Sequence, residues 1–248
     1  MLLPNQNAAT HKAWLYRLLS KIYDKSALAS VLLFKGGTCA AMLGWLDRFS
    51  VDLDFDYSGT SKELPAVRHA LEQIFKELGL AIKDASKKTP QYFLRYPAEK
   101  NSRNTIKIDV AFPVPKANIY RPYHFSDIDR VITCQTPETM FANKLIALID
   151  RYEKREVIAG RDLYDIHHFF LREFRYNEEV IKERRNVRNI APFFAKLIEF
   201  VDVHITQGTI DQGLNVLLAP VQFRRIRTHL KAETLMFLRD ELARLNSK

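Results

Sequence analysis

The stretch from Val31 to Tyr57 constrains the fold of this chain more than any other segment. It opens with an apolar run that predicts a strand; two glycines and a threonine follow, and apolar residues 39–46 then predict a short helix. From Val51 onward apolar and acidic residues alternate with period two, which is typical of a half-buried strand. One predicted face of that strand carries Val51, Leu53 and Phe55, and the other face carries Asp52, Asp54 and Asp56.

Three carboxylates on one strand face repel one another and raise each other's pKa. Such a row is tolerated at a water-exposed edge or around a cation, and Mg²⁺ in particular binds one or two carboxylates plus substrate phosphates. The pair Gly36-Gly37 precedes a predicted helix, where backbone N–H groups can approach an anion closely. Together these features favour a nucleoside triphosphate site. The alternative is a tight strand–helix turn followed by a solvated strand face.

The segments KGGT and RFSVDLDFD, around these residues, resemble the AbiEii/AbiGii group of nucleotidyltransferases in the DNA polymerase β-like superfamily. The first motif of that superfamily, a small-residue pair at a helix start followed by a DxD strand, matches Gly36, Gly37, Asp52 and Asp54. The resemblance implies that Asp52 and Asp54 are catalytic metal ligands. It also implies nucleotide-binding residues, namely Lys35, Gly36, Gly37 and Thr38.

A second alternating segment, NTIKIDVAF at 104–112, predicts a strand with Ile106, Ile108 and Val110 facing the core. Asp109 then faces the opposite way. The resemblance carries the third catalytic, metal-binding carboxylate onto Asp109, whereas the plainer interpretation is an exposed aspartate without a role. Further predicted elements are helices at 11–23 and 61–80, a strand at 91–96 and an edge strand at 131–134, with Pro113, Pro115 and Pro122 breaking regular structure.

From Pro137 the spacing becomes helical, with Thr136 as the expected N-cap. On this helix the resemblance gives Lys144 a catalytic, phosphate-binding role, and the alternative is a lysine that lies along the domain seam. Asp162, in a GRDLYDIHHFF segment similar to one in the family, is either a helix N-cap or a catalytic residue that orients a cation toward the triphosphate. Helices are also expected at 178–188, 192–205, 209–218 and 221–246, where no motif is recognised.

The composition agrees with a cytoplasmic protein. Two cysteines in 248 residues form no disulfide framework, no run reaches the length of a membrane span, and the N-terminus shows no export signal. The formal charge of +9 favours nucleic acid or another acidic partner. The basic residues form three clusters, which suit RNA but could also be solvated faces. They are Lys87, Lys88, Arg95, Lys100, Arg103 and Lys107, interleaved with Tyr92, Phe93 and Tyr96; Lys182, Arg184, Arg185 and Arg188; and Arg224, Arg225, Arg227 and Lys231.

The predicted fold is therefore α+β: a polymerase β-like nucleotidyltransferase domain with a mixed sheet at 1–135, followed by a helical domain at 136–248. The predicted reaction moves a nucleoside monophosphate from an NTP to an acceptor hydroxyl, on tRNA or another RNA, and releases pyrophosphate. Mg²⁺ or Mn²⁺ would serve as cofactor, with two ions about 4 Å apart. The resemblance further implies a toxin with a possible cognate antitoxin. The alternatives are a non-catalytic nucleotide- or RNA-binding module and a metal-dependent phosphohydrolase.

Overall fold

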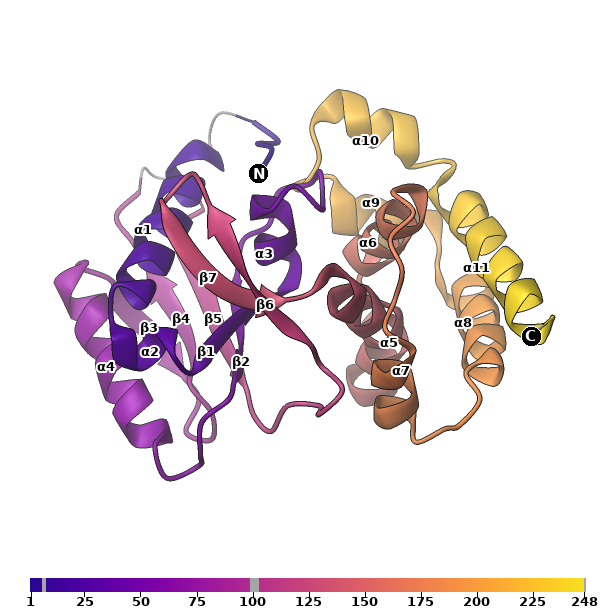
Figure 1. The fold of residues 1–248 in the computed structure, drawn as a ribbon. Helices are drawn as coiled ribbons and strands as arrows, with labels where there is room; N and C mark the ends of the chain where they lie inside the picture. The colour runs from indigo at the N-terminus through magenta and orange to yellow at the C-terminus, as the bar shows by residue number, and fades with distance from the viewer. Residues whose placement is uncertain (6–7, 99–102, 248) are drawn as a thin grey trace. The chain divides into compact units, whose positions relative to one another are not determined.

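The computed structural model describes residues 1–5, 8–98 and 103–247, which form seven strands and eleven helices. The chain divides into two compact units (Figure 1). Unit 1 comprises Met1–Val114 and Ile119–Gln135, and unit 2 comprises Pro115–Asn118 and Thr136–Lys248. Unit 1 is built around a mixed sheet and unit 2 is helical, so the predicted α+β fold class is confirmed.

The sheet of unit 1 has the strand order β3-β4-β5-β2-β1-β7-β6. The pairs β2–β5 and β1–β7 are parallel, and the other neighbouring pairs are antiparallel. The strand with the acidic alternation, β2, therefore lies at the centre of the sheet. The strands are β1 (Leu32–Lys35), β2 (Leu53–Tyr57), β3 (Ala81–Ala85), β4 (Gln91–Arg95), β5 (Thr105–Ala111), β6 (Tyr120–Phe125) and β7 (Arg130–Gln135).

One face of this sheet is apolar and lies beneath helices α1 (Ala8–Tyr23) and α4 (Leu64–Glu77), as Figure 1 shows. Alternate residues along β5 are fully buried. The helices meet the sheet through aromatic pairs: the Tyr23 and Phe55 rings lie 6.4 Å apart, and the Phe75 and Tyr92 rings 5.0 Å apart. The apolar half of each alternation thus supplies the core of unit 1, and the polar half is left on the opposite face. The remaining helices of unit 1 are α2 (Ser26–Ala29) and α3 (Gly36–Met42).

The strands of unit 1 differ from the sequence prediction at three places. The segment 131–134 was expected at the sheet edge, but β7 lies between β1 and β6. β6 itself was not predicted because it contains Pro122, which an edge strand tolerates since one side of its backbone needs no ladder partner. β3, at the other edge, was also missed because all its residues are exposed and no alternation marks them.

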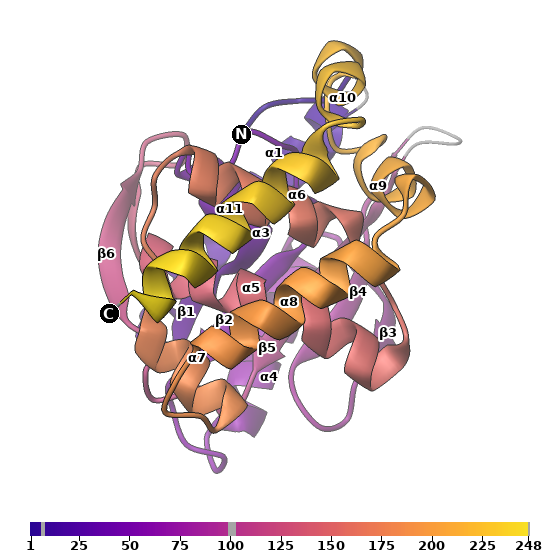
Figure 2. The same ribbon diagram turned by 90° about the vertical axis from the view of Figure 1, so that its right-hand side faces the viewer.

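Unit 2 consists of helices, and Figure 2 shows α8 and α11 side by side. The single helix expected at 221–246 is instead two: α10 buries none of its residues, and α11 packs against α8. The helices are α5 (Pro137–Arg155), α6 (Gly160–Leu171), α7 (Glu178–Arg185), α8 (Ala191–His204), α9 (Gln207–Leu214), α10 (Pro220–Ile226) and α11 (Leu230–Asn246). Thr136 caps α5 as predicted, by accepting the backbone N–H of Thr139. None of the helices among the described residues has both the length and the apolar character needed to span a membrane.

Candidate active site

A polar row crosses the face of the sheet that α1 and α4 leave uncovered. The strand register pairs Asp54 with Lys35 on one side and with Asp109 on the other, and Asp109 in turn with Gln91. Neighbouring strands lie about 4.8 Å apart, and paired residues project to the same face. Asp54 and Asp109 are therefore adjacent on the sheet. Asp52 precedes the first residue of β2 and lies outside the ladder.

Gly36 lies directly against the Asp54 carboxylate. It has a φ of +79°, and a Cβ at this position would fall 2.5 Å from Asp54 Oδ2. Both the backbone conformation and the close approach therefore require glycine. The helix expected at 39–46 begins earlier, at Gly36, so the glycines form the first turn of α3 instead of preceding it.

Replacing Gly36 with alanine should displace the Asp54 carboxylate. We expect nucleotide transfer by Gly36→Ala to fall by about tenfold to a hundredfold, because a shift near 1 Å at a reacting centre has effects of that size. The matched control is Gly44→Ala: Gly44 has a similar φ of +75°, but nothing lies within 4 Å of its added Cβ. Each variant should lose about 1 kcal/mol of stability from the positive φ. Equal transfer rates in the two variants, measured beside their melting temperatures, would contradict this account.

Thr38 is fully buried, and its side chain makes hydrogen bonds within the protein. Its Oγ1 donates to the backbone carbonyl of Asp52 and lies 2.9 Å from Ser50 Oγ. A phosphate role for Thr38 would consequently rest on its backbone N–H, one of the N–H groups without an intrahelical partner in the first turn of α3. The Thr38 side chain instead fixes the segment that carries Asp52.

Two further side chains near this segment were not identified from the sequence as parts of the site. His11, on α1, is buried with Nε2 2.9 Å from the Val51 carbonyl; burial lowers its pKa to about 4, so the ring is neutral at pH 7 and donates this N–H. The buried Arg48 guanidinium lies against Gly37, where an added Cβ would be 2.6 Å from Nη2. The His11 hydrogen bond thus holds the backbone next to Asp52, and Arg48 Nη1 donates to the Phe49 carbonyl at 2.9 Å.

Asp56 was expected on the exposed polar face but is only 1% exposed. Its carboxylate is bonded by Lys35 Nζ at 2.5 Å, Gln135 Nε2 at 2.5 Å and the Tyr120 hydroxyl at 2.7 Å. The last two partners come from the end of β7 and the start of β6, which the alternation within β2 could not reveal. Asp56 is therefore an internal anchor that holds the Lys35 ammonium beside Asp54.

Asp109 is 33% exposed and is bonded by two neighbours on the same face. Its Oδ2 lies 2.5 Å from Lys107 Nζ and 3.0 Å from Gln91 Nε2. Lys107 is two residues away on β5, and Gln91 is its cross-strand partner on β4. The signal for Lys107 was present in the alternation of β5, whereas Gln91 required the pairing of β4 with β5.

The donor set suits a hard divalent cation. Across residues 1–5, 8–98 and 103–247 no three His, Cys, Asp or Glu side chains lie close enough together to hold a metal ion as they stand. The adjacent carboxylates of Asp54 and Asp109 nevertheless match the one or two carboxylates that Mg²⁺ commonly takes alongside substrate phosphates. The residues present therefore fit a Mg²⁺ or Mn²⁺ ion that is completed by substrate.

Lys144 and Asp162 belong to unit 2, where they form a buried ion cluster. Lys144 Nζ lies 3.1 Å from Asp162 Oδ1 and 2.8 Å from Asp165 Oδ2, and Arg151 Nε lies 2.6 Å from Asp162 Oδ2. Both carboxylates are fully buried. Burial by itself raises the pKa of Asp162, but the charges of Lys144 and Arg151 outweigh it and hold the pKa below its ordinary value.

The interpretation of Asp162 as a helix N-cap is wrong. The N-cap of α6 is Ala159, and the Asp162 backbone N–H donates to the Ala159 carbonyl at 2.9 Å. The acidic side chain is in the first helical turn and points to the cations of α5. The sequence suggested a cap because an aspartate follows Gly160 at a helix start; only the packing of α5 on α6 shows its partners.

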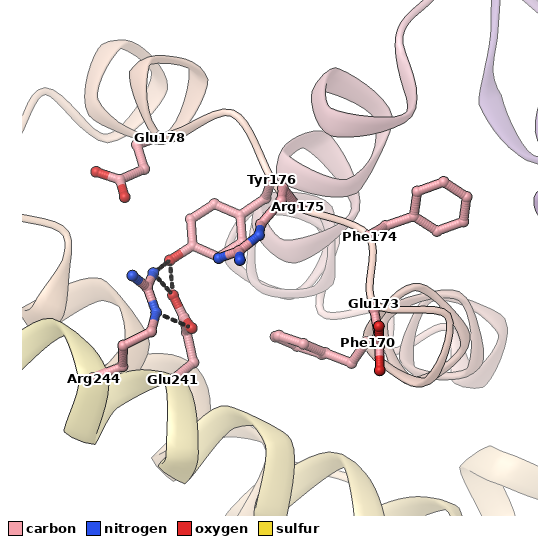
Figure 3. A pocket seen from close by; sticks show the side chains of 8 residues that line it. All are labelled: Phe170, Glu173, Phe174, Arg175, Tyr176, Glu178, Glu241 and Arg244. Atoms are coloured by element: carbon pink, nitrogen blue, oxygen red, sulfur yellow. Dashed lines mark hydrogen bonds and ion pairs between the residues drawn. The ribbon is translucent and has the colours of Figure 1, made fainter.

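Unit 2 also contains a pocket of about 440 Å³, shown in Figure 3. Aromatic side chains of Phe170, Phe174 and Tyr176 line it together with charged groups. Glu241 accepts hydrogen bonds from the Tyr176 hydroxyl and from Arg244, with Arg244 Nε at 2.8 Å. These charges compensate one another inside the pocket wall. None of the predicted site residues lines this pocket.

Solved structures from two bacteria share the fold of this chain. A Helicobacter pylori protein described as a candidate nucleotidyltransferase is 19% identical with a TM-score of 0.61, and the match covers 98% of both chains. JHP933 from Helicobacter pylori is 19% identical with a TM-score of 0.55 over 99% of both chains. MenT4, a nucleotidyltransferase toxin from Mycobacterium tuberculosis H37Rv, is 18% identical with a TM-score of 0.55 over 96% of this chain and 87% of that one.

No curated protein sequence matches the chain significantly. The family model for the nucleotidyl transferase AbiEii toxin of type IV toxin–antitoxin systems matches residues 17–243, which include every predicted site residue. The resemblance noted in the sequence around Gly36 and Asp54 is thereby confirmed over nearly the whole chain. The chain belongs to the AbiEii family of nucleotidyltransferase toxins of type IV toxin–antitoxin systems.

Proposed function

We propose that this nucleotidyltransferase moves a nucleoside monophosphate from an NTP to a hydroxyl group of tRNA or another RNA, with Mg²⁺ or Mn²⁺ as cofactor. The observation that carries the proposal is the pairing of Asp54 with Asp109 on adjacent strands, with the Gly36 backbone against Asp54. Neighbouring carboxylates repel each other, and a bound cation relieves that repulsion. A triphosphate and its metal ion supply that cation together with the remaining oxygen ligands.

In the proposed reaction the acceptor oxygen forms a bond to the α-phosphorus, the bond from that phosphorus to the bridging oxygen breaks, and pyrophosphate leaves. Asp52, Asp54 and Asp109 would hold the cation once substrate phosphates complete its coordination, and the cation would neutralise charge on the phosphates and lower the pKa of the attacking hydroxyl. The backbone of Gly36, Gly37 and Thr38 binds phosphate oxygens. Lys35, held by Asp56, adds a positive charge beside them.

The roles of Lys144 and Asp162 in this reaction are proposed from the family resemblance. An ammonium has three N–H donors, and Asp162 and Asp165 bind two of those of Lys144. We also propose that the chain acts in the cytoplasm. Family membership implies a cognate antitoxin that counteracts it.

The proposal is tested by incubating the protein with each α-labelled NTP, Mg²⁺ and total RNA. We expect label to appear in RNA, pyrophosphate to be released in equal amount, and EDTA to stop both. Release of free phosphate without labelling would indicate the phosphohydrolase alternative. NTP binding without turnover would indicate the non-catalytic binding module. Labelling of protein or of a small molecule in place of RNA would support the transfer reaction but would reject RNA as the acceptor.

A further inference from the structure

The structure separates the three basic clusters that the sequence offered as RNA-binding surfaces. In the cluster at 182–188, Lys182 is bound by Glu179 at 2.8 Å, and Arg184 and Arg185 are bound by Asp150 at 2.7 and 2.8 Å. Surface cations that are paired with nearby carboxylates add little net positive charge for attracting an anionic ligand. This cluster is therefore largely neutralised within unit 2.

The cluster at 224–231 offers charges but lacks a free aromatic surface. Arg224 and Arg225 are exposed on α10, but the Arg227 guanidinium is bound by Asp211 and lies 5.4 Å from the centre of the Phe223 ring. Nucleic acids without sequence preference are bound by cations together with aromatic rings on which bases stack. On this criterion the third cluster is incomplete.

The cluster at 87–107 differs from the other two, because it includes an exposed ring. Tyr92 and Tyr96, expected to be available, are buried in the core face, and Lys100 lies outside the described residues. Phe93, by contrast, lies on the opposite face of β4 and is 37% exposed. Phe93 therefore offers a ring surface on which a base can stack.

The cations around Phe93 are exposed as well. Arg95 follows two residues later on the same face of β4, and Lys87 and Lys88 lie in the turn between β3 and β4. None of these three cations has an ion pair with any part of the chain that the structure describes. On β3, Phe93 pairs with the acidic residue Asp84. The Asp84 carboxylate accepts a hydrogen bond from the Ala85 backbone N–H at 2.8 Å. We call Lys87, Lys88, Phe93 and Arg95 the hairpin surface.

The strand register places the hairpin surface beside the candidate active site within unit 1. Gln91 pairs with Asp109, and Phe93 pairs with Lys107, which is itself bonded to Asp109. Phe93 is therefore two residues along β4 from the strand position opposite Asp109, about 7 Å at the rise of a β-strand. Lys87 and Lys88 lie beyond Gln91, since the Pro90 carbonyl at the end of their turn accepts the Val110 N–H. A chain lying along β4 would thus pass Asp109 on its way across Phe93.

We propose that the hairpin surface binds the single-stranded end of the acceptor RNA, with a base stacked on Phe93 and the adjoining phosphates bound by Arg95 and by Lys87 and Lys88. This proposal rests on the proposed transfer reaction and deepens it by assigning the acceptor to the Asp109 side of the carboxylate pair. The nucleotide then occupies the Asp54 and Gly36 side. The ring surface suits any base, and the unpaired cations suit the backbone, so the surface fits RNA without sequence preference.

The direct test is RNA binding in EDTA, where no transfer occurs. The probe is a fluorescein-labelled adenine oligoribonucleotide of about twelve nucleotides, and the readout is fluorescence anisotropy. We expect Phe93→Ala to weaken binding by about tenfold, within the range that alanine substitution of a stacking ring gives, and Phe93→Trp to retain it. The matched control is Ile82→Ala, because Ile82 is 46% exposed on the same hairpin but pairs with buried Leu94 and so lies on the opposite face. Unchanged binding by Phe93→Ala would overturn the proposal.

A second probe separates stacking from a general effect on the surface. An abasic ribose-phosphate oligomer of the same length retains the charges and lacks the bases, so wild type and Phe93→Ala should bind it equally. Arg95→Gln should weaken both probes, by less at high salt, because phosphate contacts release counterions. If Phe93→Ala weakened the abasic probe as much as the adenine probe, stacking would be excluded.

The outcomes also distinguish this proposal from the proposed function. If wild-type protein labels RNA while Phe93→Ala binds and labels as well as wild type, the transferase is retained and the hairpin surface is rejected. If Phe93→Ala loses RNA binding in EDTA but no NTP and no acceptor supports transfer by wild type, the surface is retained and the reaction is rejected. Labelling of RNA by wild type, with Phe93→Ala raising the KM for RNA and leaving the KM for NTP unchanged, supports both.

Discussion

Asp54→Asn should abolish nucleotide transfer while leaving the fold and melting temperature close to those of the wild type. The substitution keeps the size and polarity of the side chain but removes one of the two adjacent carboxylates that we propose as ligands of the cation. We expect a loss of at least about a thousandfold, on the order of 4 kcal/mol in the transition state, because cation-stabilised charge is central to phosphoryl transfer. The measurement is transfer of α-labelled nucleotide at saturating RNA, alongside thermal unfolding.

Asp56→Asn is the matched control, since Asp56 lies two residues away on the same strand face. Its carboxylate is buried and bonded by Lys35, Tyr120 and Gln135. Removing this charge leaves Lys35 without its partner, so Asp56→Asn should lose about 3 kcal/mol of stability. Asp54→Asn should thus lose transfer with little loss of stability, whereas Asp56→Asn should lose stability and should affect transfer only through displacement of Lys35. Wild-type transfer by Asp54→Asn would refute the proposed site.

Asp162→Asn should destabilise the protein by about 3 kcal/mol at pH 7. Asp162 is fully buried and faces Lys144 and Arg151, and breaking a buried pair leaves an uncompensated charge. The measurement is urea unfolding of the full chain, in which a probe of helix content monitors the unfolding of unit 2. The control is Asp240→Asn on α11, an exposed position without an ion pair in the described residues, which should change stability by less than about 0.5 kcal/mol.

The destabilisation by Asp162→Asn should also depend on pH in one direction. The pKa of Asp162 in the folded protein lies below its ordinary value, so the ionised carboxylate contributes stability above the unfolded pKa, about 3.9. That contribution is lost as the pH falls through the lower folded pKa. The difference between wild type and Asp162→Asn should therefore be constant from about pH 5 to pH 8 and shrink below about pH 4. A difference that grew as the pH fell would contradict the sign of this pKa shift.

Transfer by Asp162→Asn bears on its proposed catalytic role separately from stability. If Asp162 orients Lys144 for the triphosphate, transfer measured well below the melting temperature should fall by tenfold or more, about 1.4 kcal/mol. A variant that is destabilised but transfers normally would make the ion cluster of α5 and α6 purely structural.

The strands and helices that carry the site could be predicted from the sequence because their signals are local. The alternation in β2 and β5 is written in consecutive residues, and so are the Pro137 helix start and the Thr136 cap. The glycine pair followed by the DxD segment identified the family for the same reason. Edge strands β3 and β6 left weaker signals, since an edge has one exposed side and need not alternate.

By itself the sequence determined the α+β class, the identity of the acidic residues and the family, because each is expressed by spacing along the chain. Only the tertiary structure decided which carboxylates are buried and which groups they contact. Asp54 and Asp56 are indistinguishable in a period-two pattern, and their burial differs because Tyr120 and Gln135 arrive from distant strands to cover one of them. Likewise Asp162 became an ion-pair partner instead of a cap because α5 brings Lys144 and Arg151 against it. Periodicity fixes which face a side chain takes, whereas its partners are set by contacts between residues far apart in the chain.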